Sequence, residues 1–381
     1  MEFLNREGAK LVGNIWPCAT SSGSRSQAAC PGVVITTGSI QVTQHMYGWL
    51  ARSLQDHGYT VMTFDVRGQG ESETTTHDGA VPAVANPQDG ANFVNGTVDA
   101  LRFLLSTDDD PYVPVGWDEA RRSAADALVN ADDLEWANPA PDALDPTRLA
   151  LVGHSLGASA VSIVQQCSNA YPDRAPTPLP AACAGQQFPI LAIAAFDSLS
   201  GGVTPVVPAF DHRADGYFLN AVPTASAPVA DERTNPTSPF GQWRTAGVDA
   251  CSITVRGGTH AEWTEIPYII SATRYGVPQA MYYVRAWFDR FVSPTASAEG
   301  FDALVSGPIP NEPAGEHREE RASLFSGKYR SACNVSDPAN PLARFDQGDL
   351  RAFAGVAAVG DWAALNAERE HGTQAQGLVH L

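Results

Sequence analysis

The sequence predicts an α/β fold in which a mostly parallel central sheet carries helices on both faces. Short apolar runs rich in β-branched residues recur along the chain, and segments with helical spacing of apolar residues separate them. Strands are expected at residues 33–37, 60–65, 148–152, 188–196, 204–210 and 251–256. Helices are expected at residues 46–57, 91–105, 158–164 and 279–292.

The individual elements follow from local patterns. The first strand, Val-Val-Ile-Thr-Thr, consists of β-branched residues, which is typical of a buried strand. In the first helix, Met46, Leu50 and Leu54 fall on one face, and Gly58 follows as a terminating residue. The second helix has the same apolar spacing and precedes an acidic, Pro-containing insert at residues 108–145.

The composition of the 381-residue chain is that of a folded globular protein, with 44% apolar and 17% charged residues. A formal net charge of −18 leaves no basic patch to neutralise a nucleic-acid backbone or an anionic membrane surface. No apolar run approaches the ~18–20 residues that span a bilayer, and the first residues do not resemble a signal peptide. We therefore expect no nucleic-acid partner and no integral membrane association. The sequence gives no indication of the oligomeric state.

Six cysteines, none in a C-x-x-C pair or a Cys/His cluster, predict disulfide bridges and no zinc or redox site. Two of them bracket a Ser/Gly-rich stretch and the next two bracket a Pro-rich loop, which is typical of bridges that staple exposed segments. Such bridges favour an extracellular protein; six free thiols in a cytoplasmic protein are the alternative. Among the ~15 possible pairings, the sequential one is expected: Cys18–Cys30, Cys167–Cys183 and Cys251–Cys333.

The segment Gly153-His-Ser-Leu-Gly157 matches the G-x-S-x-G pattern of a nucleophile elbow. It lies between an apolar run at 149–152 and a small-residue helix start at 158–164, which is the strand–turn–helix context that the pattern requires. The two glycines permit the tight turn that lifts a serine hydroxyl clear of the sheet. Because the chain contains 33 glycines, chance spacing in a loop is the alternative, and the flanking elements favour Ser155 as a nucleophile.

Three separate motifs resemble those of the α/β-hydrolase superfamily of serine esterases and lipases. They are Thr37-Gly-Ser39, Asp65-Val-Arg-Gly-Gln-Gly-Glu-Ser72 and the elbow. The resemblance covers residues 30–292 and implies an α/β-hydrolase fold. Thr37 replaces the histidine usual in the first motif, which is closer to the corresponding loops of cutinase-like polyester hydrolases. The lid domain that capped relatives insert between strands six and seven is absent, because few residues separate the two predicted strands.

The resemblance implies a histidine base after the last strand, since the family order is serine, acid, histidine. His260 fits, because it follows the strand at 251–256 and a Gly-Gly-Thr segment, and its surroundings resemble the histidine loop of lipases and esterases. A structural hydrogen bond in the loop is the alternative role for His260. The other histidines precede the serine, belong to the elbow, occupy the expected place of the acid or lie in the tail: His45, His57, His77, His154, His212, His317, His371 and His380.

A carboxylate is needed after the seventh strand to hold the imidazole in the correct tautomer and to stabilise its cation. Asp215 is the preferred acid, because Arg213-Ala-Asp-Gly-Tyr217 resembles the turn that carries the acid in the family. Asp197, directly after the sixth strand, and Asp211 are the alternatives. Each could instead be a solvated loop carboxylate or a helix cap.

The resemblance also implies an oxyanion hole made of two backbone N–H groups. These are the amides of Leu156 and Ser39, with Ile40 in place of Ser39 if the turn is shifted by one residue. The motif at residues 65–72 is expected to be structural, with no catalytic part.

These residues predict a serine carboxylic-ester hydrolase that forms an acyl-enzyme and requires no cofactor or metal. Without a lid, the site is expected to be open and to accept bulky small-molecule, lipid or polymer esters, by analogy at the level of the fold. Tyr217, Phe218 and Trp263 are candidates to line the cleft, with a place in the core as the alternative. An amidase or peptidase with the same triad and a non-catalytic binding protein are the alternative functions.

Three segments are expected along the chain. Residues 1–30 form N-terminal strands and a Ser/Gly-rich loop, residues 31–292 form the catalytic domain, and residues 293–381 form an extension. The extension has too few apolar residues for its own core, so it is expected to wrap around the catalytic domain. A small separate domain is the alternative. The Ala-rich residues 350–365 are expected to be helical.

Overall fold

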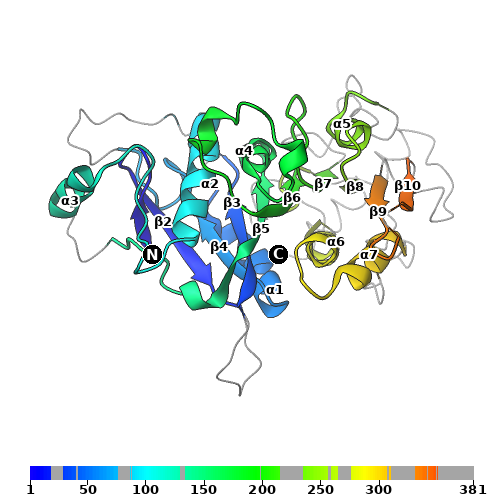
Figure 1. Cartoon of the computed structure of the whole chain (residues 1–381), viewed down its shortest axis with the longest axis horizontal. Coiled ribbons are helices and arrows are strands. Elements are labelled where there is room, and N and C mark those ends of the chain that lie inside the picture. Colours follow the sequence, from blue (N-terminus) through cyan, green and yellow to red (C-terminus); the bar gives the residue numbers. More distant parts are fainter. Residues whose placement is uncertain are drawn as a thin grey trace, which may run out of the picture. The chain divides into compact units, whose positions relative to one another are not determined.

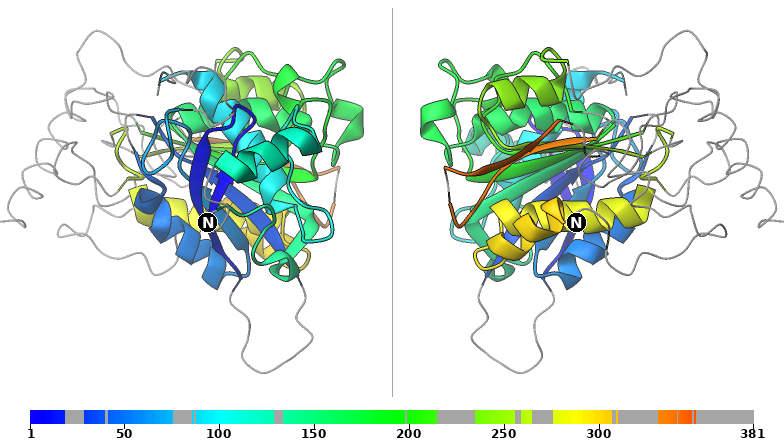
Figure 2. Two further views of the ribbon diagram at one scale, coloured as in Figure 1. Left: turned by 90° about the vertical axis from the view of Figure 1, so that its left-hand side faces the viewer. Right: turned by 90° about the vertical axis from the view of Figure 1, so that its right-hand side faces the viewer.

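The computed structural model confirms the α/β class and divides into two compact units, Met1–Ala195 and Phe196–Leu381. Each unit carries strands of a sheet with helices on both faces (Figure 1, Figure 2). The structure describes residues 1–18, 29–39, 42–75, 86, 88–128, 134–197, 199–214, 235–255, 259–264, 276–306, 309, 331–340, 342–348 and 350.

The sheet of the first unit has a parallel centre and an antiparallel edge. β3 (Cys30–Thr36) is parallel to both of its neighbours, β4 (Thr60–Phe64) and β5 (Leu144–His154). Every residue of β4 is buried, as expected for a parallel strand covered on two faces. At the edge, β2 is antiparallel to β4, and β1 is antiparallel to β2. The strand order is β1 (Glu2–Leu4), β2 (Lys10–Trp16), β4, β3, β5 and β6 (Ile190–Phe196).

The helices of the first unit lie on opposite faces because the chain crosses the sheet in two directions. The step from β3 to β4 runs toward β2, whereas the steps from β4 to β5 and from β5 to β6 run away from it. The connection from β3 to β4 contains α1 (Gly48–Asp56), whereas α2 (Gly90–Leu104) and α4 (Leu156–Val164) follow β4 and β5. Right-handed crossovers therefore put α1 on one face and place α2 and α4 side by side on the other (Figure 1). Asp89 caps α2 by accepting a hydrogen bond from Ala91 N–H.

Two details of the first unit differ from the sequence prediction. The helix expected at residues 46–57 begins with a separate 3₁₀ turn, η1 (Gln44–Tyr47), before α1. The insert at residues 108–145 contains a helix that was not predicted, α3 (Glu119–Leu128). Short 3₁₀ turns complete the unit: η3 (Pro141–Ala143), η4 (Gln165–Cys167), η5 (Pro172–Arg174) and η6 (Ala181–Cys183).

The second unit continues the α/β pattern with a mixed sheet. Its strand order is β7 (Ala209–Ala214), β8 (Ala250–Val255), β9 (Ala332–Ser336) and β10 (Arg344–Gln347). β7 and β8 are parallel, whereas β9 and β10 are added in antiparallel fashion from the C-terminal extension. α5 (Pro239–Thr245) lies on one face of this sheet, and α6 (Gly276–Phe291) and α7 (Ser297–Val305) lie on the other (Figure 2).

The region between β6 and β7 matters most for the site. The strand predicted at residues 204–210 is placed too early along the chain, because β7 begins only at Ala209 and ends at Ala214. Pro205 and Pro208 lack the N–H groups that a central strand donates to its neighbour, so the chain stays irregular until the second proline has passed. The absence of a cap domain between the two strands is confirmed, since β6 ends at Phe196. Apart from Leu350, the helix expected at residues 350–365 lies outside the described residues.

All six cysteines form disulfides, in the sequential pairing expected from the sequence: Cys18–Cys30, Cys167–Cys183 and Cys251–Cys333. The third bridge joins residues that face each other in the register of β8 and β9. It therefore fastens a strand from the C-terminal extension to the strand that leads toward His260.

Reduction of these bridges is expected to destabilise the protein. The bridges span sequence separations of 12, 16 and 82 residues, and loop-closure entropy values them at roughly 3, 3 and 4–5 kcal/mol. The double variant Cys251→Ala/Cys333→Ala should therefore lower the unfolding free energy more than Cys167→Ala/Cys183→Ala does. Denaturant titration measures both losses, and thiol titration of the denatured, unreduced protein should find no free thiol. Free thiols in that titration would contradict the pairing.

Within the described part of the chain, no helix combines the length and the apolar character that crossing a membrane requires.

Candidate functional site

Ser155 occupies a strained turn between β5, which ends at His154, and α4, which begins at Leu156. Its backbone dihedral angles are φ 57° and ψ −120°, a conformation that L-residues rarely adopt. Conformations of this kind cost on the order of 1–3 kcal/mol and persist only where the surrounding structure enforces them. Among the described non-glycine residues, only Ala184 and Asp197 also have a positive φ. The surrounding turn therefore holds Ser155 in a backbone conformation that is intrinsically unfavourable for a serine.

The two glycines of the G-x-S-x-G segment are required by close backbone packing. A Cβ on Gly153 would overlap the carbonyl oxygen of Gly157, and a Cβ on Gly157 would overlap the carbonyl oxygens of Thr36 and Thr37. The first helical turn of α4 is thus seated directly on the end of β3. This contact brings the segment that follows β3 to the elbow.

The predicted oxyanion donors belong to these two adjoining segments. Leu156 N–H is the first amide of α4, a position that has no acceptor within a helix. Ser39 follows β3 and is nearly buried, with 8% of its surface exposed. In the described part of the chain, neither amide donates a hydrogen bond to another protein group. Ile40, the alternative donor, lies outside the described residues.

In the second unit, the imidazole of His260 is hydrogen-bonded to a carboxylate. His260 Nδ1 lies 2.7 Å from Asp197 Oδ2, and both side chains are mostly buried. A carboxylate that accepts from Nδ1–H leaves Nε2 as the basic nitrogen. Asp197 is itself held on β7, because its N–H donates to the carbonyl of His212 and its Oδ1 accepts from Ala214 N–H at 3.4 Å. The pair is therefore fixed at the carboxyl end of a strand, where α/β proteins place functional side chains.

The structure describes only one of the other two candidate acids, Asp211. Asp211 is buried within β7, where its carboxylate accepts from Leu199 N–H at 2.9 Å and from Ser252 Oγ at 3.4 Å. Its hydrogen bonds thus serve the packing of the sheet. Asp215, the acid preferred from the sequence, lies outside the described residues, as do Tyr217 and Phe218.

Trp263 is not a cleft residue, contrary to its candidacy from the sequence. Its side chain is fully buried and stacks on Phe196 with ring centroids 5.5 Å apart and planes at 7°. Its indole N–H donates to His212 Nδ1 at 2.8 Å. Because Phe196 immediately precedes Asp197 and Trp263 follows His260 by three positions, this stack holds the histidine loop beside its carboxylate.

The buried His212 has both ring nitrogens engaged in hydrogen bonds and is uncharged. Burial lowers the pKa of His212 to about 4, so its ring is neutral at pH 7. Its Nδ1 accepts from Trp263, and its Nε2 therefore carries the proton and donates to Gln279 Oε1 at 3.3 Å. Both nitrogens are thus engaged in supporting the loop.

The turn that carries His260 is stabilised within itself. The Glu262 carboxylate accepts from Thr259 N–H at 3.1 Å, and Glu262 N–H donates to the Thr259 carbonyl at the same distance. Glu262 is almost completely buried, and sequence reasoning assigned it no role. The sequence does show a carboxylate, Glu262, two positions after His260, but only the structure shows that this carboxylate closes the turn.

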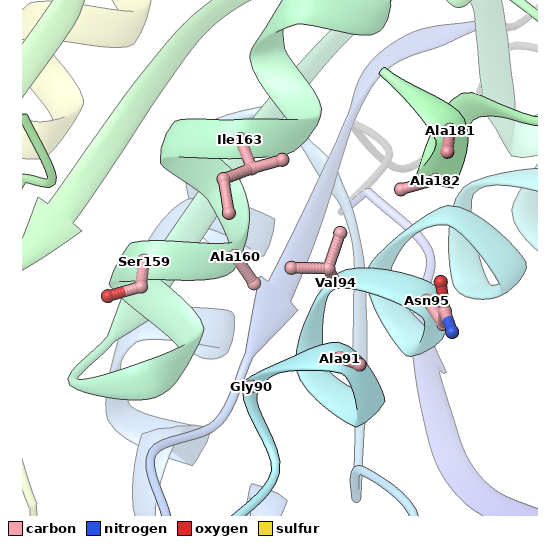
Figure 3. A pocket seen from close by; sticks show the side chains of 9 residues that line it. All are labelled: Gly90, Ala91, Val94, Asn95, Ser159, Ala160, Ile163, Ala181 and Ala182. Carbon is pink, nitrogen blue, oxygen red and sulfur yellow. The ribbon is translucent and has the colours of Figure 1, made fainter. Parts of the chain in front are cut away.

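A cavity of about 460 Å³ in the first unit is separate from the elbow. Ala160 and Ile163 of α4 face Val94 of α2 across it (Figure 3). Ser155, Leu156 and Ser39 do not line it. The lining residues are mostly small and apolar: Gly90, Ala91, Val94, Asn95, Ser159, Ala160, Ile163, Ala181 and Ala182. Among the described residues, no group of three His, Cys, Asp or Glu side chains is placed to hold a metal ion.

Residues 33–164 match the family model of the alpha/beta hydrolase fold. The match runs from β3 through α4 and so contains Ser39, Ser155 and Leu156, whereas Asp197 and His260 lie beyond it. A search of curated proteins found no match. The family match supports a hydrolase.

Proposed function

We propose that this chain, which has the α/β-hydrolase fold, is a serine hydrolase that cleaves carboxylic esters through an acyl-enzyme. The observation that carries the proposal is the strained backbone of Ser155, held at φ 57° directly before a helix N-terminus. Strain of this kind is retained where it serves a function. Two amides that have no acceptor in the described part of the chain belong to the adjoining segments, Leu156 N–H directly after the serine and Ser39 N–H in the segment on which Gly157 packs.

The proposed chemistry assigns one task to each group. Ser155 Oγ attacks the ester carbonyl while His260 Nε2 takes the hydroxyl proton, and the carbonyl oxygen becomes an oxyanion that the amides of Leu156 and Ser39 stabilise. The proton then passes from His260 to the leaving alcohol, which departs and leaves the acyl group on Ser155. Water attacks this ester with His260 again as base, which releases the acid and restores the serine.

Asp197 is proposed as the carboxylate that orients His260, in place of the Asp215 preferred from the sequence. The 2.7 Å hydrogen bond from His260 Nδ1 supports this assignment. Some family members are expected to take the acid from the strand before the usual one, and Asp197 directly follows β6.

The substrate class and the compartment are part of the proposal. The lack of a cap domain between β6 and β7 supports an accessible site that admits lipid or polymer esters. Three disulfides support an extracellular location, because such bonds persist in oxidising compartments.

A fluorophosphonate probe tests the nucleophile, and matched substrates test the bond. The probe should label the folded protein at Ser155, as mapped by peptide mass spectrometry, and should not label heat-denatured protein. Ser162→Ala is the control, because the Ser162 hydroxyl on α4 donates to the Ala158 carbonyl and should be dispensable for labelling.

The type of bond cleaved is tested with matched substrates. The protein is expected to hydrolyse p-nitrophenyl esters but not the matching anilides. A preference for the anilides would make the protein an amidase, and absence of labelling would make it a binding protein.

A further inference from the structure

We propose that Tyr47 is a positioning residue for hydrolysis: its hydroxyl links the Gly38 peptide to His154 and thereby holds the Ser39 amide in register with Ser155. This inference rests on the proposed function. Tyr47 does not contact the reacting atoms in this proposal and acts through the two segments that carry them.

The link consists of two hydrogen bonds to one phenol oxygen, all within the first unit. Gly38 N–H donates to Tyr47 Oη at 3.2 Å, and Tyr47 Oη lies 2.7 Å from His154 Nδ1. Tyr47 is fully buried and His154 is 2% exposed, so water does not compete for these bonds. A Cβ on Gly38 would lie 3.0 Å from His154 Nδ1 and 3.4 Å from Tyr47 Oη. The loop, the phenol and the elbow histidine are therefore packed against one another without spare room.

The direction of the first bond follows from the chemistry of its groups: a backbone N–H can only donate, so the Gly38 amide uses the phenol oxygen as its acceptor. We assign the phenol proton to the second bond, since a buried hydroxyl needs an acceptor and the partner at hydrogen-bond distance is His154 Nδ1. His154 Nδ1 is unprotonated in this assignment. Burial raises the pKa of the Tyr47 phenol above its ordinary value, so the phenol keeps this proton at neutral pH. In the described part of the chain, these are the two hydrogen bonds of the hydroxyl.

This arrangement selects which amide can serve the oxyanion. The Gly38 N–H is occupied by Tyr47, whereas the Ser39 N–H has no acceptor among the described residues. Glycine is the most flexible residue of a chain, so the segment that contains Gly38 needs an external contact to keep its next amide in place. Oxyanion donors are effective only when held within about 0.5 Å of the productive position. Tyr47 supplies that contact from the same side chain that touches the elbow.

The element that carries Tyr47 is itself firmly anchored. In η1, Gln44 N–H donates to Asp65 Oδ1 at 2.6 Å, and the Gln44 side chain accepts from Thr63 Oγ1 at 2.9 Å. The other oxygen of Asp65 accepts from Glu71 N–H at 3.0 Å. The motif at residues 65–72 therefore supports η1, and through Tyr47 it supports the loop after β3. This gives the motif a positioning role, where the sequence indicated only a structural one.

Tyr47→Phe tests the proposal, because it removes the oxygen and leaves the ring. We expect kcat for ester hydrolysis to fall by about 10- to 100-fold, less than the ~10²–10³ lost when an oxyanion donor is deleted outright. KM should stay within about twofold, since ground-state binding does not use the oxyanion hole. The rate of fluorophosphonate labelling at Ser155 should fall in parallel with kcat, because phosphylation also places an oxyanion there.

Tyr112→Phe is the matched control. Tyr112 is another buried phenol of the first unit, and its hydroxyl donates to the Leu4 carbonyl at 2.9 Å. Tyr47→Phe loses two buried hydrogen bonds and Tyr112→Phe loses one, so both variants should unfold at a lower denaturant concentration than the parent, Tyr47→Phe at the lowest. Only Tyr47→Phe should lower kcat. A loss of stability with unchanged kcat in both variants would overturn the proposal and leave Tyr47 as a core residue.

The other end of the link provides a second test that does not depend on Tyr47→Phe folding. His154→Gln retains an acceptor for the phenol proton, whereas His154→Leu does not. We expect His154→Gln to keep most of the parent kcat and His154→Leu to lose about as much as Tyr47→Phe. Equal kcat values for the two His154 variants would overturn the proposal.

Ser155→Ala distinguishes failure of this proposal from failure of the proposed function. If Ser155→Ala retains full activity, the proposed function itself fails, whatever the activity of Tyr47→Phe. If Ser155→Ala is inactive and Tyr47→Phe is fully active, only the role of Tyr47 is rejected.

Discussion

Ser155→Ala is expected to lower kcat for ester hydrolysis by roughly 10⁶, which is the loss found when a nucleophilic serine is removed from a hydrolase that keeps its other groups. The change deletes one oxygen and leaves the φ and ψ of the turn as they are. No cavity is created in the core, so the unfolding free energy should change by less than about 1 kcal/mol. His260→Ala should cause a loss of similar size, and the double variant should lose little more, because the two side chains act as one unit.

Steady-state kinetics on p-nitrophenyl esters, with far-ultraviolet circular dichroism and a thermal melt on each variant, measure this prediction. Ser162→Ala serves as the control for removing a hydroxyl from the helix that follows the elbow, and should retain activity. Additive losses in the double variant would show that Ser155 and His260 act in separate steps. Ser155→Ala within about tenfold of the parent would remove the serine from the mechanism.

The elbow could be predicted from the sequence because its constraints are local. Gly153 and Gly157 are required by backbone contacts inside five residues and with the end of β3, and such a requirement leaves a readable pattern. The disulfides were predictable for a similar reason, since Cys18–Cys30 and Cys167–Cys183 close short segments of the chain. A structural feature whose constraints all fall within a short stretch of sequence can be predicted from that stretch alone.

The acid could not be chosen from the sequence, because two carboxylates follow two neighbouring strands. The sequence placed the seventh strand too early, and the prolines that delay β7 to Ala209 change which residues lie inside it. Asp211 then falls within the strand, and Asp197 is left at the end of β6. Which carboxylate meets the imidazole depends on how the histidine loop packs, and that packing is long-range.

The roles of two aromatic residues were also beyond the sequence. An aromatic residue three positions after a histidine can line a cleft or enter the core, and burial of Trp263 on Phe196 is decided by contacts 67 positions apart. Tyr47 lies 9 positions from Gly38 and 107 from His154, so no local pattern connects the three. Positioning residues of this kind become visible only when the chain is folded.

Asp197→Asn is expected to lower kcat by about 10⁴, the loss that an amide in place of the orienting carboxylate produces in a serine hydrolase. An amide can still hydrogen-bond to His260 Nδ1, but its NH₂ group would hold the ring in the tautomer with the proton on Nε2, which cannot accept the serine proton. The substitution also removes the negative charge that stabilises the imidazolium form of His260. The fold should be retained, because the amide occupies the same volume and its oxygen can still accept from Ala214 N–H.

Asp215→Asn is the matched control, since Asp215 is the acid that the sequence favoured. With Asp197 as the partner of His260, Asp215→Asn should leave kcat within about fivefold of the parent, as expected for a carboxylate outside the reacting unit. Fluorophosphonate labelling at Ser155 should be slowed by Asp197→Asn and unaffected by Asp215→Asn. The reverse ranking in both measurements would assign the acid to Asp215, and the 2.7 Å contact of Asp197 with His260 would then hold the loop without sustaining the proton transfer.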